Sequence, residues 1–166
     1  NRRSAALLQP TFNRRSAALP QPTFNRSCHR MIVRAREVGR LIEVRRTWPV
    51  EPSDFDEAAI AHWLQLVQSV ERPVVCIDLR QASVLPPKLA DNLSLLMGRS
   101  KGRYERVANI FAPSNPTLFM QLERIAREIA DPTRRVFTDV DAAIQWLDEV
   151  LTAEERIRLR AFLLGP

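Results

Sequence analysis

The sequence predicts an α/β domain in which a mixed, mostly parallel sheet is covered by helices. The run from Pro73 to Arg80, PVVCIDLR, is short, rich in β-branched residues and closed by charge, which is typical of a strand buried on both faces. Amphipathic helical patterns precede and follow it, and more strands alternate with helices toward the C-terminus. Such alternation gives a largely parallel sheet with right-handed crossovers. We therefore expect the element order ββαβαβαβα, followed by one further helix.

Two β-prone segments, residues 31–38 and 41–48, open the predicted domain and are joined across Gly-Arg, which favours a hairpin. In the second segment Ile42 and Val44 alternate with Glu43 and Arg45. This period of two predicts that one face of the strand is solvated.

The first two helices begin at recognisable signals. Ser53 is placed to cap the first helix, whose first turn is acidic, as the helix dipole prefers. The proline pair at 86–87 begins the second helix, directly after the buried strand. The apolar stripes expected to bury these helices are Phe55, Ala59, Trp63, Val67 and Val70, and then Leu89, Leu93 and Leu96.

Two more strands, Arg106–Ala112 and Arg135–Phe137, are each followed by a helix. The fourth helix is expected to be capped by Thr138 or Asp139. The stripes of the third and fourth helices are Leu118, Leu122, Ile125 and Ile129, and Val140, Ile144, Leu147 and Leu151.

A terminal helix begins at Thr152, because the sequence TAEE is a capping-box signature. We interpret its face of Ile157, Ala161 and Leu164 as packing on the sheet, with a homodimer contact as the alternative. We expect solvated edges for the nearby cationic side chains, which are Arg134, Arg135, Arg156, Arg158 and Arg160.

Residues 1–30 differ in character from the rest of the chain. The sequence NRRSAALLQPTF at 1–12 is repeated at 13–24 with one change. This segment holds six arginines and no acidic residue, so 19 basic residues face 19 acidic ones from Met31 onward. We expect a disordered tail at 1–30, a domain at 31–151 and a terminal helix at 152–166, with the natural start near Met31. A basic nucleic-acid-binding face on the domain is not expected.

No motif in the sequence identifies a reaction. Phosphate-binding glycine loops and a nucleophile elbow are absent, and His29 and His62 are the only histidines. We expect no enzymatic activity, no cofactor and no metal site. Cys76 is interpreted as a small core residue, and two cysteines without a disulfide framework favour a reducing cytoplasm. No apolar run is long enough for a membrane span.

The element order, the strand from Val75 to Arg80 and the sequence DAAIQWL at 141–147 together resemble the STAS-like superfamily, which includes bacterial anti-sigma-factor antagonists. The resemblance covers roughly residues 33–151 and implies a regulatory domain that works by protein–protein contact. Lipid-carrier domains of the Sec14 type share part of this architecture.

The chain departs from the antagonists at the position of their phosphorylated serine. In that family an aspartate–leucine pair is followed, seven residues beyond the leucine, by D-S-S-G. Matching the pair to Asp78-Leu79 places PPKL at residues 86–89 over D-S-S-G, so Lys88 stands at the phosphoacceptor position. The resemblance therefore implies no serine phosphoswitch here, and Ser83 in the same loop does not correspond.

Two loops that leave strand ends are the candidate site. The carboxyl ends of parallel strands meet at one edge of a sheet, which is where open α/β sheets hold ligands. Both loops enter helix N-termini, which favour anions, although such residues often cap helices and do nothing more. We expect this edge to bind an acidic group of a protein partner, through residues chosen from Asp78, Arg80, Ser83, Lys88, Ser114, Asn115 and Thr117.

A second function stays open at this point, namely shelter for a small lipid or other apolar ligand. A cavity of roughly 300 Å³ or more beneath the third and fourth helices would favour it.

Overall fold

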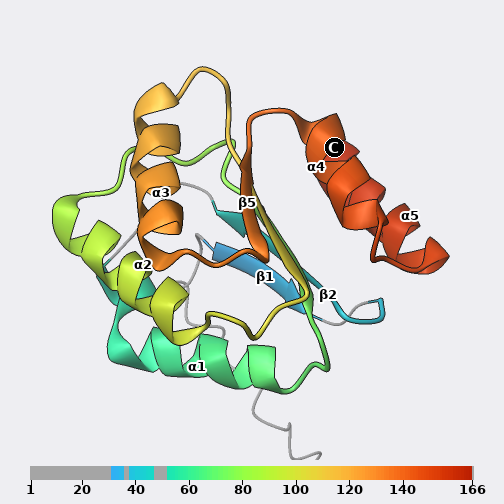
Figure 1. The fold of residues 1–166 in the computed structure, drawn as a ribbon, viewed down its shortest axis with the longest axis horizontal. Coiled ribbons are helices and arrows are strands. Elements are labelled where there is room, and N and C mark those ends of the chain that lie inside the picture. Colours follow the sequence, from blue (N-terminus) through green and yellow to red (C-terminus); the bar gives the residue numbers. More distant parts are fainter. Residues whose placement is uncertain (1–30, 36–37, 47–51, 166) are drawn as a thin grey trace, which may run out of the picture.

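The computed structural model describes residues 31–35, 38–46 and 52–165. A five-stranded sheet lies between two layers of helices (Figure 1). The strands are β1 (Met31–Ala35), β2 (Leu41–Arg46), β3 (Val74–Asp78), β4 (Arg106–Ile110) and β5 (Arg134–Phe137). The helices are the 3₁₀ turn η1 (Pro52–Phe55), α1 (Glu57–Gln68), α2 (Pro87–Arg99), α3 (Pro116–Ile129), α4 (Val140–Asp148) and α5 (Ala153–Leu164).

The strands lie in the order in which they occur in the chain, β1-β2-β3-β4-β5. β1 is antiparallel to β2, and the other three pairs are parallel. Gly39 turns the hairpin with a φ of +57°, a backbone region that glycine enters without steric cost. The predicted α/β class, with a mixed and mostly parallel sheet, is confirmed.

Alternate residues of each strand supply two separate cores. Val74, Cys76 and Ala108 face α4 and α5, whereas Val75 and Val107 face α1. α2 and α3 cover the rest of that second face (Figure 1). Val74, Val75 and Cys76 are completely buried, so the prediction of a central strand covered on both faces is confirmed.

The caps of two helices are as predicted, and one is not. Asp139 caps α4, and Thr152 forms the expected capping box with Glu155. The cap of α1 is Asp56, whose carboxylate accepts from the N–H of Ala59 at 2.8 Å. The prediction of Ser53 was wrong because residues 52–55 form a separate 3₁₀ turn before the helix begins.

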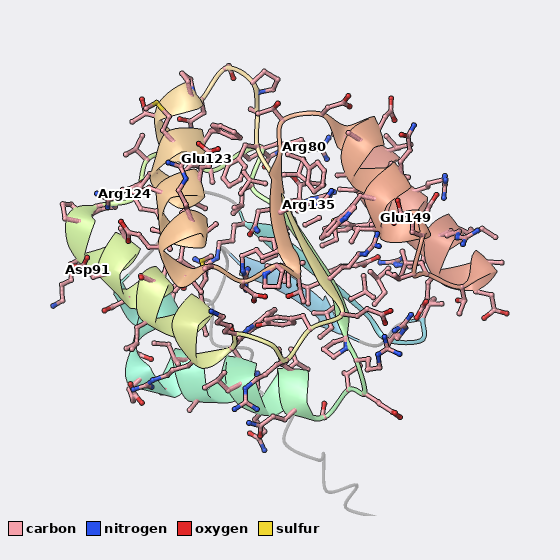
Figure 2. The ribbon with its side chains drawn as sticks, viewed as in Figure 1. Arg80, Asp91, Glu123, Arg124, Arg135 and Glu149 are labelled. Carbon is pink, nitrogen blue, oxygen red and sulfur yellow. The ribbon has the colours of Figure 1, made fainter. Side chains whose placement is uncertain are left out.

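On the outer face of α3, Glu123 and Arg124 point to solvent (Figure 2). Glu123 pairs with Arg127 at 3.5 Å, as its spacing on a helix predicts. Every helix within the described residues is too short or too polar to cross a membrane.

The solvated face predicted for β2 is instead buried. Glu43 is only 2% exposed, because α5 packs over it and Arg158 donates to both of its carboxylate oxygens, at 2.8 and 2.5 Å. An alternation of apolar and charged residues is therefore no proof of solvent when a second helix brings the opposite charge. For the same reason Arg158 is not the solvated side chain that was expected.

Two further expectations about arginines and α5 were wrong. Arg134 is buried, at 9% exposure, beneath the helices of the α1–α3 face. α5 does pack on the sheet, but through Leu159, Phe162 and Leu163. The predicted face points outward, with Ile157 71% exposed and Leu164 62% exposed.

Candidate functional site

A cluster of charges stands at the carboxyl ends of β2 and β3. The register of these strands places Arg45 beside Asp78, and the Arg45 Nε donates to Asp78 Oδ2 at 3.0 Å. Arg80 donates to both oxygens of the same carboxylate, from Nε and Nη2, at 2.9 Å each. The Arg80 backbone N–H adds a bond to Oδ1 at 3.2 Å, so one carboxylate holds two guanidinium groups.

This arrangement determines how the neighbouring groups titrate. Burial alone would raise the pKa of Asp78, but the hydrogen bonds and charge of Arg80, with Arg45, outweigh it and hold that pKa below its ordinary value. Burial, and then the charge of Asp78, raises the pKa of the Cys76 thiol. The thiol beneath the cluster is therefore a core group and no nucleophile.

The same two arginines hold the end of α5. The Arg80 Nη2 donates to the Leu163 carbonyl at 2.9 Å, and the Arg45 Nη2 donates to the Phe162 carbonyl. The Arg45 guanidinium also stacks over the Phe162 ring, 4.7 Å from its centroid. Cations suit the unsatisfied carbonyls in the last turn of a helix, so Asp78 fixes α5 through its two arginines.

These groups line a shallow hollow at the sheet edge, which we call the edge hollow. It is bounded by Arg45, Asp78, Arg80, Gln81, Leu163, Leu164 and Gly165. Asp78 is buried, while the side chains of Arg45 and Arg80 are 27% and 32% exposed. Positive charge and an exposed leucine therefore lie together at this edge.

The two loops of the predicted site are adjacent, as expected. The Asn115 side chain donates to the Ala82 carbonyl at 2.9 Å and accepts from the Leu118 N–H at 3.2 Å. Gln121 of α3 exchanges two hydrogen bonds with the backbone of Leu85. Both polar groups of Asn115 are thus used inside the fold, and its role is to cap α3 and brace the loops. Ser114 and Thr117 are exposed beside it.

The structure does not bring the two predicted cations together. Arg80 reaches the end of α5 on one face of the sheet. Lys88 is exposed in the first turn of α2, which covers the opposite face. Ser83 is half-buried between them in the chain.

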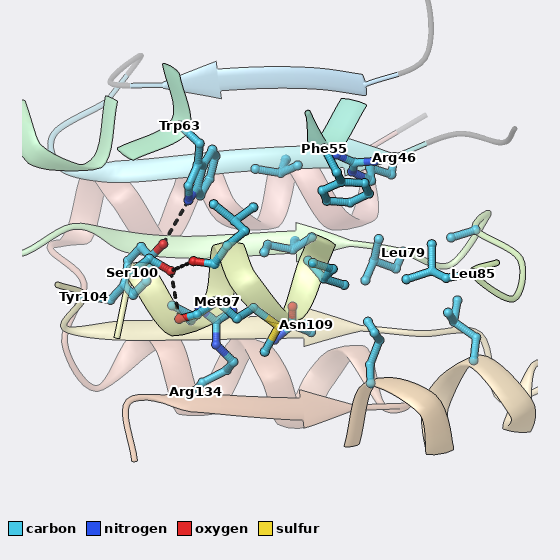
Figure 3. A pocket seen from close by; sticks show the side chains of 18 residues that line it. Arg46, Phe55, Trp63, Leu79, Leu85, Met97, Ser100, Tyr104, Asn109 and Arg134 are labelled. Carbon is cyan, nitrogen blue, oxygen red and sulfur yellow. Dashed lines mark hydrogen bonds between the residues drawn. The ribbon is translucent and has the colours of Figure 1, made fainter. Parts of the chain in front are cut away.

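A separate cavity lies on the α1–α3 face, between the sheet and α2 (Figure 3). The volume of this cavity is about 80 Å³. Most of its wall is apolar, including Val44, Phe55, Leu79, Leu93, Met97 and Leu122. A cavity beneath both the third and the fourth helix, which would have favoured the ligand-binding alternative, is not found within the described residues, because α3 and α4 cover opposite faces of the sheet.

A few polar groups interrupt this apolar wall. Tyr104 accepts a hydrogen bond from the Trp63 indole at 2.9 Å (Figure 3). The Arg134 guanidinium lies 5.4 Å from the centre of the Tyr104 ring, and its Nε is buried without a hydrogen-bond partner in the part of the chain that the structure describes. Burial lowers the pKa of Arg134 below its ordinary value, and it lowers the pKa of Arg46 to about 10.

Sequence reasoning missed Arg45 and the end of α5 as parts of the edge hollow. Arg45 precedes Asp78 by 33 positions, and only the parallel register of β2 with β3 makes them neighbours. A charged residue near the end of each of two adjacent predicted strands was the available signal. Arg134 and Tyr104 carried no such signal, because Arg134 is the first residue of a short strand and Tyr104 lies in the loop before β4.

Within the described residues, no group of three or more His, Cys, Asp or Glu side chains is placed to hold a metal ion. No protein-family model matches the sequence, and no curated protein matches it. The site itself must therefore carry the functional argument.

Proposed function

We propose that the chain is a non-enzymatic α/β interaction domain of the STAS-like kind, which acts in regulation by binding a protein partner at the edge hollow. The partner supplies an acidic side chain next to an apolar one. The domain does so without a serine phosphoswitch, since Lys88 stands where the antagonists carry that serine.

The observation that carries this proposal is the excess of positive charge in the edge hollow. Two guanidinium groups face one carboxylate, and the Nη1 groups of Arg45 and Arg80 have no hydrogen-bond partner among the described residues. Arginine in a fixed geometry suits a carboxylate, which it binds through paired N–H groups. Asp78 already orders both arginines, so little conformational entropy is lost when a partner binds.

An apolar contact lies next to this charge. Leu164 borders the edge hollow, and Ile157 stands seven residues earlier on the same side of α5. Both side chains are more than 60% exposed. An acidic residue flanked by an apolar side chain would meet both features at once, as interfaces with an apolar centre and a charged rim do.

The test places a photo-crosslinking amino acid at Gln81 in cells that express the full chain. Gln81 is exposed, borders the edge hollow and makes no side-chain hydrogen bond within the described part of the chain. We expect a defined protein to be crosslinked from Gln81. A crosslinker at Lys88, on the other face of the sheet, should not capture it.

The affinity of the captured, purified partner is then measured against two variants with the same chemical change. Gln81→Glu adds a negative charge at the edge hollow and should weaken binding roughly tenfold, about 1.4 kcal/mol. Gln65→Glu adds the same charge on the exposed side of α1 and should leave the affinity unchanged. Equal affinities for the two variants, or capture from Lys88 alone, would contradict the proposal.

The cavity beneath α2 favours a second candidate function, the binding of a small apolar ligand. Its volume of about 80 Å³ is smaller than the roughly 300 Å³ of typical ligand pockets. A ligand would therefore have to be slender, and protein binding at the edge hollow is the first proposal.

A further inference from the structure

The cavity beneath α2 is narrow but extends along the sheet. Pairs of residues two positions apart on three adjacent strands form its floor: Val44 and Arg46, Ile77 and Leu79, and Val107 and Asn109. Tyr104 lines it before β4 begins, and Leu79 lines it where β3 ends. The paired part of β3 and β4 is five residues long, or about 16 Å at the usual rise per residue. The shape suits an extended chain more than a compact ring system.

The helix above the cavity is held from its sides. α2 contacts α3 and the η1 turn more than the strands beneath it. The N-cap residue of α2, Pro86, makes no side-chain cap hydrogen bond, and Leu95 near the middle of the helix is 45% exposed. A helix supported in this way can shift outward without breaking the sheet, which gives a ligand a route to the cavity.

Two polar side chains on the wall, Tyr104 and Arg134, carry donors that lack acceptors within the described residues, whereas Ser100 and Asn109 donate to backbone carbonyls. The Tyr104 hydroxyl accepts from Trp63, and no described residue accepts its own proton. Arg134 is nine-tenths buried, and its Nε–H has no acceptor among the described residues. The charge of Asp131 acts on Arg134, but Asp131 binds Thr133 through Oδ1 and forms no ion pair with Arg134 among the described residues. A buried donor left unpaired is costly, and most such groups in native proteins have a partner.

We propose that this cavity binds an aliphatic carboxylate of medium chain length, with the chain along the apolar floor and the carboxylate at Arg134 and Tyr104. The carboxylate accepts hydrogen bonds and donates none, so it matches both unpaired donors. Its charge compensates a guanidinium that the fold has removed from water. The apolar remainder of the wall, which would otherwise enclose empty space, gains contact with the chain.

This site is independent of the edge hollow, because the two lie on opposite faces of the sheet. Failure of one proposal therefore leaves the other standing.

The experiment is calorimetric titration of the delipidated full chain with decanoate below its micelle concentration, next to decanol and decylammonium. We expect saturable binding of decanoate with one site per chain. Decylammonium has the same tail and the opposite charge, so it should bind at least tenfold more weakly. Absence of saturable decanoate binding, or equal affinity for the ammonium compound, would overturn the proposal.

Variants then locate the bound molecule. Arg134→Gln should weaken decanoate at least tenfold. Arg135→Gln is the matched control, since Arg135 is exposed toward α4 and stacks 5.1 Å from the Trp146 ring (Figure 2), and it should bind decanoate like the parent chain. Unchanged binding in Arg134→Gln would exclude the assigned head-group position.

Two variants keep the test decisive if Arg134→Gln does not fold. Tyr104→Phe removes only the hydroxyl and should weaken decanoate several-fold while changing decanol little. Leu96→Trp adds bulk at a half-buried cavity position and should abolish decanoate binding with the unfolding transition still cooperative. If both variants bind decanoate as the parent does, the ligand lies elsewhere.

Discussion

The two faces of the sheet are covered by helices in different ways. α5 adds charged and polar contacts to its apolar ones: Arg158 binds the buried Glu43, and Arg45 and Arg80 bind its last carbonyls. On the other face, α2 is held by apolar side chains and leaves a cavity above β2, β3 and β4. One face thus combines an apolar core with fixed polar partners, while the other relies on apolar contacts and has room.

The difference follows from what each kind of contact requires. A buried ion pair stabilises only when its geometry is good and its other hydrogen bonds are made, so α5 has a single allowed position. Apolar contacts have no preferred direction, so a helix that packs through them can lie at several distances from the sheet. We infer that the α5 face supplies a rigid recognition surface and the α2 face an adaptable interior.

The largest expected loss of stability comes from removing the positive charge that holds α5 on the sheet. Arg158→Ala leaves Glu43 buried without its two hydrogen bonds, and we expect a loss of about 3 kcal/mol in the free energy of unfolding at pH 7. Arg156→Ala, on the exposed side of the same helix, should cost under about 0.5 kcal/mol. Urea unfolding followed by circular dichroism measures both.

A double variant shows whether charge or shape holds α5. Replacing Glu43 and Arg158 together by leucine removes both charges, and buried ion pairs replaced in this way often lose no stability. We expect the double variant to be at least about 2 kcal/mol more stable than Arg158→Ala alone. If it is equally unstable, the polar contacts do not explain how α5 is held.

The fold was largely predictable from sequence because its signals are local. The period of the apolar residues, the prolines and the capping residues gave ten of the described elements, and η1 is the exception. Glu43 and Arg158 looked solvated because a single sequence does not show which helix brings a partner of opposite charge to a given strand. Arg134 looked solvated because the sequence does not show which helices cover the first residue of β5. The edge position of Asp78 was predictable, but its partner Arg45 depends on strand register.

Asp78→Asn tests the second set of polar contacts that holds α5, and its effect on the free energy of unfolding should depend on pH. The folded pKa of Asp78 lies below its unfolded value of about 3.9. The carboxylate therefore stabilises the fold above about pH 4, and this contribution is lost as the pH falls through the folded pKa. We expect Asp78→Asn to cost about 2 kcal/mol at pH 7.

The comparison with the parent chain is made from pH 7 to pH 2. The stability difference between Asp78→Asn and the parent should narrow as the pH falls below about 4. A difference that stays constant down to pH 2 would show that Asp78 acts through its shape and not through its charge.

The same substitution on each face tests whether only one face has room. Ala82 lines the cavity, and Ala143, on the inner side of α4, is completely buried. Ala143→Leu overpacks a filled core and should cost about 1–3 kcal/mol. Ala82→Leu fills empty space and should stabilise the fold by about 0.5–1 kcal/mol. Thermal and urea unfolding of the two variants give the sign of each stability change directly. Equal losses of stability would mean that the α2 face is as tightly packed as the α4 face.

The smallest expected effect concerns the outer side of α5, which carries apolar side chains that are exposed to water. Ile157 is 71% exposed and contributes little to the core, so Ile157→Ser should change the free energy of unfolding by less than about 0.5 kcal/mol. Two positions later, Leu159 is completely buried, and Leu159→Ala should cost about 2–5 kcal/mol. If Ile157→Ser destabilises the isolated chain as much as Leu159→Ala does, α5 has more than one buried side, and Ile157 packs against another copy of the chain. A neutral result keeps Ile157 available to the partner that Leu164 and the edge hollow would bind, and the partner's affinity for Ile157→Ser then measures the apolar half of that contact.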